Sequence, residues 1–347
     1  MFCTVNEETM EKDALITLKN IVKHFDISGS LLDQISFSKG RFSLEKTIVH
    51  AVNDVSFVVK KGETLSIVGE SGCGKSTLAR TIIGLYKPDS GEIFYGDTRL
   101  DTLTEKEWLP YRVKMQMVFQ NPYASLNPRK RVQDILEEPI RYHEPHLSSA
   151  EVKEKVASVM EQVGINPLWA NKLPHEFSGG QRQRISIARA IILKPECIIA
   201  DEPISALDVS IQAQILNLLV ELQDRYKLTY IFISHDLSVV EHISSRVAVM
   251  YIGSLCEMAP AKKLFEEPKH PYTKALLSAI PRVGSKGFHH ISLPGDIPTP
   301  IHPPSGCAFH TRCHYADSRC IAEKPKCIVY DDNHLVACHA VEENRIE

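Results

Sequence analysis

The sequence predicts an α/β fold with a parallel sheet, and three observations support that prediction. From about residue 14 to 265, short apolar runs alternate with helical patterns. A glycine-rich loop follows one of these runs directly, and a second run ends in two consecutive acidic residues. The chain has 347 residues, of which 43% are hydrophobic and 24% charged. That composition is typical of globular proteins, and the length allows about two domains.

The apolar runs are the predicted strands of this sheet. Each is short and continuous, as expected when both faces of a strand are covered. They lie at residues 64–68, 197–200, 230–234 and 247–252.

Two other regions of the chain differ from this alternating pattern. Residues from about 121 to 190 show mostly helical patterns, including a capping box at 148–151, and predict a helical insertion between two halves of the sheet domain. After about residue 266, Pro and His become frequent, which predicts little regular structure before a cluster of cysteines.

Charge and hydropathy exclude several functions. The chain has 40 Lys and Arg against 43 Asp and Glu, a formal net charge of −3. Without a general positive field, non-specific binding to nucleic acid or anionic lipid is not favoured, and we expect no nucleic-acid partner. No apolar run reaches the length of a membrane span, and the acidic N-terminus lacks the pattern of a secretion signal. The sequence therefore predicts a cytoplasmic protein.

The glycine-rich loop at residues 69–77, GESGCGKST, fits the phosphate-loop pattern G-x-x-x-x-G-K-[ST]. Its glycines let successive backbone N–H groups point at phosphate oxygens, and a helix predicted over 76–85 adds the positive end of its dipole. Lys75 can reach the β- and γ-phosphates, and the Ser76 hydroxyl can bind Mg²⁺. A chance glycine turn is the alternative, but the strand before the loop and the helix after it favour a nucleotide site.

Two strand ends supply the other residues expected at such a site. The run at 197–200 ends in Asp201 and Glu202. In phosphate-loop ATPases, an Asp at this place holds Mg²⁺, and an adjacent carboxylate can deprotonate the attacking water. His235 follows the run at 230–234 and is expected to contact the γ-phosphate. Taken alone, each of these features would be an ordinary polar strand end.

A second anion site is predicted where FSGGQRQR, residues 177–184, begins a helix. Its Ser-Gly-Gly places unhindered N–H groups and a hydroxyl at the helix N-terminus. Kinases, GTPases and transport ATPases share the phosphate loop, so this second motif is the feature that discriminates among them.

The order of these motifs, GESGCGKST, VFQNPYASLNPR, FSGGQRQR, CIIADEP, SALD and ISHD, resembles the ATP-binding subunit of an ABC transporter. The resemblance implies an α/β fold with a phosphate-loop (RecA-like) ABC ATPase core, a helical signature subdomain and a small Cys-rich C-terminal extension. It places the ATP-binding domain at 14–265, with the helical subdomain at about 121–190, and the extension at 266–347.

The resemblance also implies roles for individual residues. Gln120 would contact Mg²⁺ and the lytic water, Glu202 would be the general base, and His235 would touch the γ-phosphate. Ser178 and Gly180 would act on the nucleotide held by the opposite subunit. Phe25 is the candidate for stacking on adenine, with an aromatic core residue as the alternative. The remaining residues implied to bind ATP and Mg²⁺ are Gly69, Glu70, Ser71, Gly72, Cys73, Gly74, Lys75, Ser76, Thr77 and Asp201.

Over essentially the whole chain, the sequence is similar to the oligopeptide and dipeptide importer ATPases. VFQNPYASLNPR, HPYTKALLSAIP and PGDIPTPIHPPSGC carry this closer resemblance. It implies the second ATPase of a pair, with a homologous sibling ATPase, two transmembrane permease subunits and an extracytoplasmic peptide-binding protein as partners. The chain would then lie at the cytoplasmic face of the inner or plasma membrane. Similar ATPases serve nickel and glutathione importers, which remain alternatives for the solute.

Five of the nine cysteines crowd into the end of the chain, and disulfides are rare in a reducing cytosol, so the cluster suggests metal binding. The segment is Pro-rich and is expected to bury little apolar area, so a metal would supply folding energy. By resemblance to the peptide-importer ATPases, Cys307, Cys313, Cys320 and Cys338 hold a [4Fe–4S] cluster. Cys327 looks supernumerary. Zinc is an alternative, although the spacing lacks its usual C-x₂-C pair, and thiols without metal are another.

Two other classes of function compete with transport. A soluble ABC ATPase acting on ribosomes or DNA would carry two cassettes or a long insertion, whereas this chain has one phosphate loop and one signature. A non-hydrolysing regulatory subunit would lack Lys75, Glu202 or His235, and all three are present. The sequence therefore favours a transport ATPase.

Overall fold

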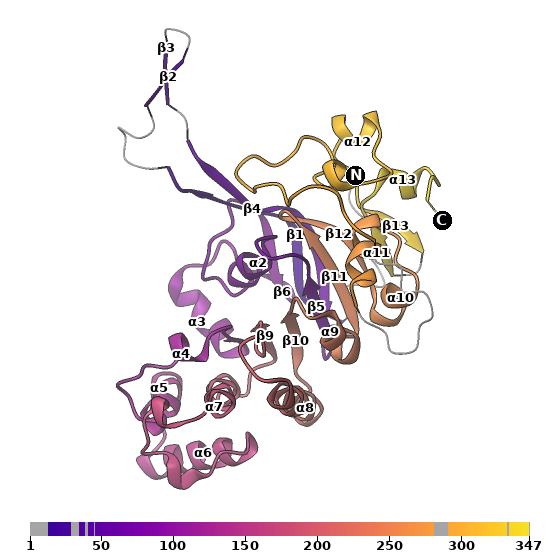
Figure 1. Cartoon of the computed structure of the whole chain (residues 1–347). Helices are drawn as coiled ribbons and strands as arrows, with labels where there is room; N and C mark the ends of the chain where they lie inside the picture. Colours follow the sequence, from indigo (N-terminus) through magenta and orange to yellow (C-terminus); the bar gives the residue numbers. More distant parts are fainter. Residues whose placement is uncertain are drawn as a thin grey trace. The chain divides into compact units, whose positions relative to one another are not determined.

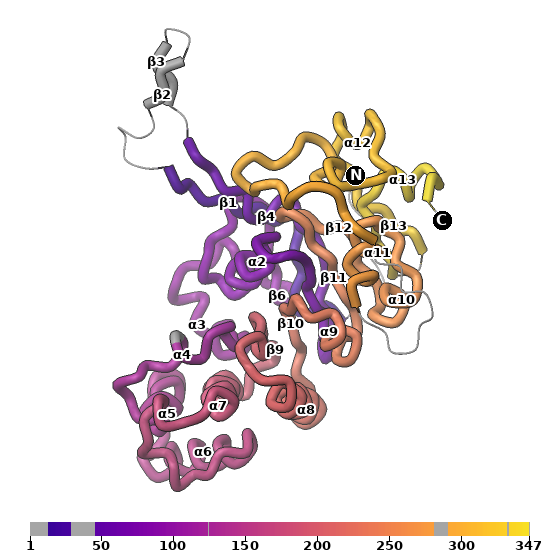
Figure 2. Tube along the Cα trace, in the orientation of Figure 1, coloured from indigo at the N-terminus to yellow at the C-terminus, as the bar shows by residue number. Residues whose placement is uncertain are grey.

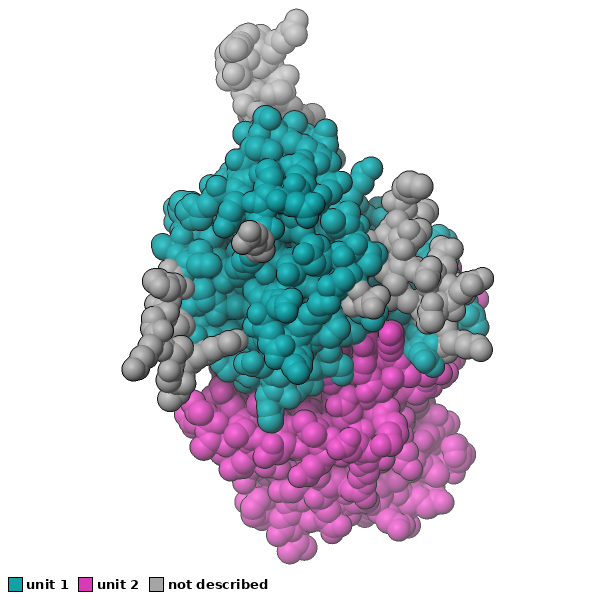
Figure 3. All heavy atoms as spheres, turned by 90° about the vertical axis from the view of Figure 1, so that its right-hand side faces the viewer, with its two compact units in different colours: residues 1–59, 67–101, 235–347 teal, residues 60–66, 102–234 magenta. Residues whose placement is uncertain are grey.

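The computed structural model describes residues 13–28, 35–38, 41–44, 46–280, 291–331 and 333–346. The chain divides into two compact units, which Figure 3 shows in different colours. Unit 1 comprises residues 1–59, 67–101 and 235–347, and unit 2 comprises residues 60–66 and 102–234. The predicted domain boundary near residue 265 stays a prediction.

Unit 2 contains three parallel strands, β8 (Met115–Val118), β9 (Cys197–Asp201) and β10 (Thr229–Ile233). Cys197 pairs with Met115 on one side and with Thr229 on the other. Every residue of β9 and β10 is buried, as expected of apolar strands in a parallel arrangement. The strands predicted at 197–200 and 230–234 are thus confirmed, with bounds that differ by one residue.

Between residues 102 and 234, the other regular elements of unit 2 are helices, which Figure 1 labels. The helix α6 begins with the predicted capping box, in which Ser148 N–H donates to Glu151 Oε2 at 2.7 Å and Ser148 Oγ accepts from Glu151 N–H. The helices α5, α6 and α7 contact one another, which agrees with the predicted helical insertion. The bounds are α3 (Glu105–Lys114), α4 (Pro122–Ser125), α5 (Val132–His143), α6 (Ser149–Gln162), α7 (Gly179–Ile191) and α8 (Val209–Tyr226), with 3₁₀ turns η1 (Pro167–Trp169) and η2 (Pro174–Glu176).

Unit 1 contains two antiparallel arrangements of strands. One has the order β4-β1-β6-β7, and the other has the order β11-β12-β14-β13. A separate pair, β2 (Ile35–Ser38) and β3 (Arg41–Leu44), forms an antiparallel hairpin. The remaining bounds are β1 (Ala14–Asp26), β4 (Ile48–Lys60), β6 (Ser90–Tyr95), β7 (Thr98–Arg99), β11 (Arg246–Tyr251), β12 (Ser254–Pro260), β13 (Ile328–Asp331) and β14 (His334–Val336).

The predicted strands at 64–68 and 247–252 correspond to β5 (Thr64–Val68) and β11. The tube in Figure 2 turns back from β11 along β12. The helices of unit 1 are α2 (Lys75–Ile82), α9 (Leu237–Ile243), α10 (Ala261–Glu266), α11 (Pro271–Ser278), α12 (Ser318–Ala322) and α13 (His339–Glu342), with the 3₁₀ turn η3 (His310–Arg312). Among the described helices of both units, none combines the length and the apolar character that a membrane crossing requires.

The C-terminal extension has more regular structure than the sequence predicts. Residues 291–309 contain neither helix nor strand, in agreement with the prediction. Beyond them, however, β14 pairs with β12 through Val336 and Leu335, and β13 pairs with β14. This pairing was not predicted, because each strand has only three or four residues and shows no clear pattern.

The expectation that the segment carrying the four cysteines buries little apolar area is wrong at Phe309, which is 2% exposed. The extension contributes Tyr272, Leu277 and Phe309 to a buried cluster that also contains Tyr251 and Leu264. The ring centroids of Tyr251 and Tyr272 lie 4.7 Å apart, and those of Tyr251 and Phe309 lie 5.2 Å apart. Each buried aromatic ring contributes substantial apolar area. The extension therefore belongs to the core of unit 1 and does not depend on a metal for all of its folding energy.

A fully buried carboxylate fixes the extension to β12. Glu257 accepts hydrogen bonds from Lys269 N–H at 2.7 Å, from His270 N–H at 3.0 Å and from His334 Nε2 at 2.7 Å. His270 in turn accepts from Tyr272 N–H through Nδ1 and caps α11. Because a buried carboxylate is costly unless it is paired, these contacts make the extension necessary to the stability of β12.

We predict that His270 makes the stability of the fold depend on pH. Burial lowers the pKa of His270 from 6.5 to about 4, against an opposing effect of Glu257. The unfolded chain therefore binds a proton that the folded chain excludes, so this contribution to stability is present above pH 6.5 and is lost as the pH falls toward 4. We expect a loss of about 2 kcal/mol between about pH 7 and pH 5.

The measurement is urea unfolding of the wild type and of His270→Asn at several pH values. Asn retains an acceptor for the helix cap but does not titrate. The difference in unfolding free energy between the two proteins should shrink as the pH falls. A constant difference would contradict the assignment.

Candidate nucleotide-binding site

The predicted phosphate loop lies between β5 and α2, and its backbone passes very close to neighbouring strands. Gly69, Gly72 and Gly74 have φ values of 148°, 79° and 100°. A Cβ at Gly74 would lie 2.0 Å from Ala51 O, and one at Gly69 would lie 2.2 Å from Met250 O. Only glycine fits at these two positions, because a side chain would collide with backbone.

Lys75, the first residue of α2, is folded back into the loop. Its side chain is buried, and Nζ donates to Gly69 O at 2.8 Å and to Glu70 O at 3.0 Å. Ser76 and Thr77 follow it in the first turn of the helix. The ammonium group, the helix N-terminus and the curled backbone thus lie together, which is the arrangement that binds a polyphosphate.

The side chain of Cys73 packs inside the loop. Its thiol is buried, and that burial raises its pKa while Lys75 opposes the shift. The Cys73 carbonyl accepts from Gly253 N–H at 2.9 Å, which links the loop to the turn between β11 and β12. A buried thiol with a raised pKa is a structural cysteine and a poor nucleophile.

The sequence analysis missed two side chains of the extension that contact the loop. Tyr272 OH accepts from Glu70 N–H at 3.0 Å, and Arg312 Nη1 donates to Glu70 Oε2 at 2.9 Å. The HPYT motif contains Tyr272, but nothing in the sequence indicates that it reaches residue 70.

Phe25, the predicted adenine-stacking residue, is half-buried near the end of β1. Its ring meets the edge of the Tyr86 ring at a centroid distance of 5.2 Å, and Lys23 Nζ lies 5.4 Å from its centroid. These contacts fit a stacking surface as well as a packed aromatic, so its role stays a prediction.

Unit 2 brings Gln120 and Glu202 together. Glu202 Oε2 accepts from Gln120 Nε2 at 2.8 Å, and Glu202 N–H donates to Ile233 O at 3.0 Å. Glu202 has φ of 46°, a left-handed conformation that is uncommon outside glycine and costly to hold. Asp201, the residue before it, is the buried last residue of β9.

The signature motif forms the predicted helix start. Ser178 is the N-cap of α7, where Ser178 Oγ accepts from Gln181 N–H and Ser178 N–H donates to Gln181 Oε1 at 2.9 Å. Ser178 is exposed, and Gly179 and Gly180 occupy the first turn. A Cβ at Gly180 would lie 2.5 Å from a methyl group of Ile211 on α8, so the glycine permits close packing of the two helices.

His235 lies between β10 and α9 and is exposed. The next residue, Asp236, caps α9 by accepting from Ser238 N–H at 3.0 Å. Lys75 and His235 belong to unit 1, and Gln120, Ser178, Asp201 and Glu202 belong to unit 2.

The four cysteines predicted to bind a cluster gather in the extension. Burial, with a smaller effect of the other three thiols, raises the pKa of Cys307 to about 12. Cys313 behaves likewise, with a pKa of about 11, and all six pairs among the four cysteines interact electrostatically. Within the ranges that the structure describes, no three His, Cys, Asp or Glu side chains are arranged to hold a single metal ion. The eight described cysteines form no disulfide.

Three features together define the class of protein as a phosphate-loop ATP-binding cassette. They are the glycine loop ending in Lys-Ser, the Asp-Glu pair at a strand end and the helix that starts with Ser-Gly-Gly. Comparison with known proteins agrees with this class. Residues 52–205 match the ABC transporter family, and residues 256–320 match the family described as oligopeptide/dipeptide transporter, C-terminal region.

Two relatives and one solved structure extend the match. The chain is 52% identical to OppF, the oligopeptide transport ATP-binding protein of Haemophilus influenzae, over 88% of this chain and 93% of that protein. It is 49% identical to AppF of Bacillus subtilis, also an oligopeptide transport ATP-binding protein, over 94% of this chain and 98% of that protein. A post-hydrolysis dimer of the ATP-binding cassette MJ0796 with ADP and Pi matches 71% of this chain and 98% of its own, with 28% identity and a TM-score of 0.60.

The chain therefore belongs to the ABC transporter family, in the group of oligopeptide and dipeptide transport ATP-binding proteins. This confirms the family and the fold class predicted from the motifs.

We predict that two glycines of the phosphate loop respond differently to replacement by alanine. Gly74→Ala should lower the free energy of unfolding by more than about 3 kcal/mol, because its Cβ would collide with Ala51 O. A Cβ at Gly72 would have no atom within 4 Å, so Gly72→Ala should lower the free energy of unfolding by only about 1 kcal/mol, for the left-handed backbone. Thermal and urea unfolding measure both, and equal effects would argue against the close approach.

Proposed function

We propose that this chain is the ATP-hydrolysing subunit that energises import of oligopeptides or dipeptides through a membrane ABC transporter. One observation carries the proposal. The Gln120–Glu202 hydrogen bond orients a carboxylate at a strand end, in a chain whose near full-length relatives are named as oligopeptide transport ATP-binding proteins. Import of nickel or of glutathione is the alternative for the solute.

In this mechanism, the phosphate loop binds the triphosphate through its N–H groups, and Lys75 neutralises charge on the β- and γ-phosphates. Ser76, Gln120 and Asp201 would hold Mg²⁺, which would neutralise negative charge on the triphosphate. Glu202 accepts a proton from the attacking water, while the Gln120 amide fixes the carboxylate. His235 contacts the γ-phosphate.

We propose that hydrolysis takes place in a dimer with a homologous sibling ATPase. The exposed position of Ser178 at the start of α7 supports this, because its hydroxyl and the N–H groups of Gly179 and Gly180 can reach a nucleotide on another chain. ATP binding would close the pair and hydrolysis would reopen it, which would move two transmembrane permease subunits between two states. An extracytoplasmic peptide-binding protein would deliver the solute, and the ATPase would sit peripherally on the cytoplasmic face.

The test of the proposed base is Glu202→Gln in the transporter reconstituted with its sibling, permeases and binding protein. We expect ATP turnover and peptide uptake to fall about 100- to 1,000-fold, with MgATP affinity within about threefold of the wild type. Glu221→Gln, an exposed position on α8, is the matched control. Undiminished hydrolysis would contradict the role of Glu202. Uptake of nickel or glutathione in place of peptide would show that the solute is not a peptide.

We infer that Cys307, Cys313, Cys320 and Cys338 hold a [4Fe–4S] cluster with a structural role. Four cysteines in one extension match the donor set of such a cluster, and the backbones of two of them are joined by the hydrogen bond from Cys307 N–H to Cys320 O at 2.8 Å. Zinc, which cysteine thiolates also bind, is the alternative metal.

We predict that protein purified without oxygen contains about four irons and four sulfides per chain and has the broad visible absorption of a cluster. Cys313→Ser should lose both the iron and the absorption, whereas Cys327→Ser should retain them. A colourless wild-type protein, with zinc or without metal, would contradict the cluster.

A further inference from the structure

We propose that Arg312 and Tyr272, both in the C-terminal extension, are positioning residues of the nucleotide site. They hold Glu70 in the phosphate loop and neutralise its charge, so that the affinity for MgATP depends on the extension. All the residues concerned belong to unit 1.

Glu70 is held through three of its groups. Its N–H donates to Tyr272 OH at 3.0 Å, its carboxylate accepts from Arg312 Nη1 at 2.9 Å, and its carbonyl accepts from Lys75 Nζ at 3.0 Å. The lysine that binds phosphate and the two residues of the extension therefore meet at one residue of the loop. A displacement of Glu70 would change the position of the Lys75 ammonium group.

The supports of Glu70 are themselves fixed by packing. Arg312 is 7% exposed, and its guanidinium carbon lies 6.0 Å from the centroid of the Tyr251 ring. Tyr272 is fully buried, and its ring packs against Tyr251 and Phe309. The backbone N–H of Arg312 also donates to the backbone carbonyl of Phe309 at 3.0 Å. Side chains that are locked in this way can fix a loop, because they have few other conformations.

Charge gives Arg312 a second effect. A carboxylate in a phosphate loop repels the triphosphate, and the interaction is strong where protein excludes water. The Arg312 guanidinium pairs with the Glu70 carboxylate, and the two side chains are 8% and 23% exposed. The pair therefore presents no net negative charge to the nucleotide. Loss of Arg312 would leave Glu70 unpaired beside the binding loop.

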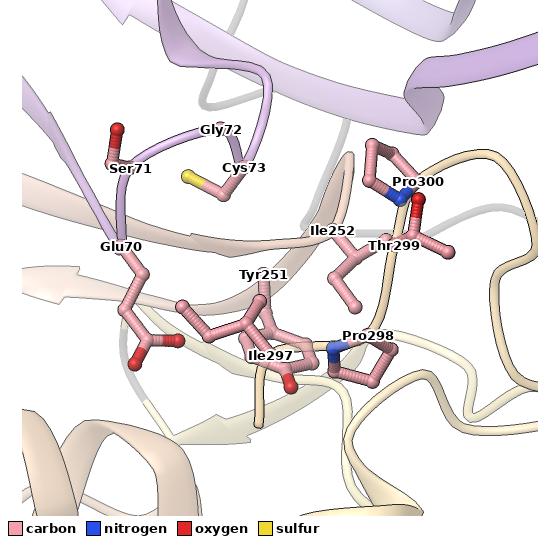
Figure 4. Close-up of a pocket in the computed structure, with 10 residues that line it drawn as sticks. All are labelled: Glu70, Ser71, Gly72, Cys73, Tyr251, Ile252, Ile297, Pro298, Thr299 and Pro300. Atoms are coloured by element: carbon pink, nitrogen blue, oxygen red, sulfur yellow. The ribbon is translucent and has the colours of Figure 1, made fainter.

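The extension also faces the loop from a second side. Residues 70–73 of the loop and residues 297–300 of the extension line a pocket of about 210 Å³. Figure 4 shows the two stretches on opposite walls of this pocket. The extension segment is attached to β4 by the hydrogen bond from His50 N–H to Pro300 O at 2.9 Å. Three separate stretches of the extension, around Tyr272, residues 297–300 and Arg312, thus approach the same loop.

The test is a double-mutant cycle on the purified full chain, with equilibrium binding of MgATP as the readout. Arg312→Gln should raise the dissociation constant roughly tenfold. The double variant with Glu70→Gln should return it to within about threefold of the wild type, because neither residue is then charged. Arg319→Gln is the control, since Arg319 lies in the extension but pairs with Glu323, Glu342 and Glu343. We expect wild-type affinity for that control.

Hydrogen exchange separates positioning from general stability. Tyr272→Phe keeps the packed ring and removes only the acceptor for Glu70 N–H, so we expect faster exchange at residues 69–75 and a roughly threefold weaker affinity. Wild-type affinity in a folded Arg312→Gln protein, or a double variant no better than that single variant, would overturn the proposal. If Arg312→Gln does not fold, Tyr272→Phe decides, and wild-type exchange and affinity would overturn it. Neither measurement depends on the transported solute or on a cluster.

Discussion

The close approach of the phosphate-loop backbone to its neighbours is the constraint on which the rest of unit 1 depends. The carbonyls of Ala51 and Met250 occupy the space where a side chain at Gly74 or Gly69 would lie. The loop can keep its curl only if β4 and β11 hold those carbonyls in place. Those strands are held in turn by their sheets, so the nucleotide site depends on backbone packing over much of the unit.

Polar anchoring adds a second layer to this arrangement. The side chains of Glu257 and Glu70 lie within the protein. The carboxylate of each accepts hydrogen bonds from groups of the C-terminal extension. Glu257 fixes the extension to β12, and Glu70 joins it to the phosphate loop. The cysteine-rich segment thus serves the cassette through ordinary hydrogen bonds and ring packing, whether or not a metal is bound to it.

Much of the fold and of the site could be predicted because the signals are local. A continuous apolar run indicated β5, and a motif of nine consecutive residues indicated the phosphate loop. The contact between Arg312 and Glu70 joins residues 242 positions apart, and no local pattern encodes it. The same holds for β14, a three-residue strand whose partner is remote in sequence. The left-handed conformation of Glu202 was also missed, because glutamate is not a residue type that indicates a positive φ.

The burial of Glu257 also constrains how such a cassette can evolve. A stop codon just before His334 would remove one of the three donors and leave the Glu257 carboxylate bonded only to the N–H groups of Lys269 and His270. A partly satisfied carboxylate inside the protein is costly, so gradual trimming from the end lowers stability at that step. Such a tail, once acquired, is inherited together with the cassette.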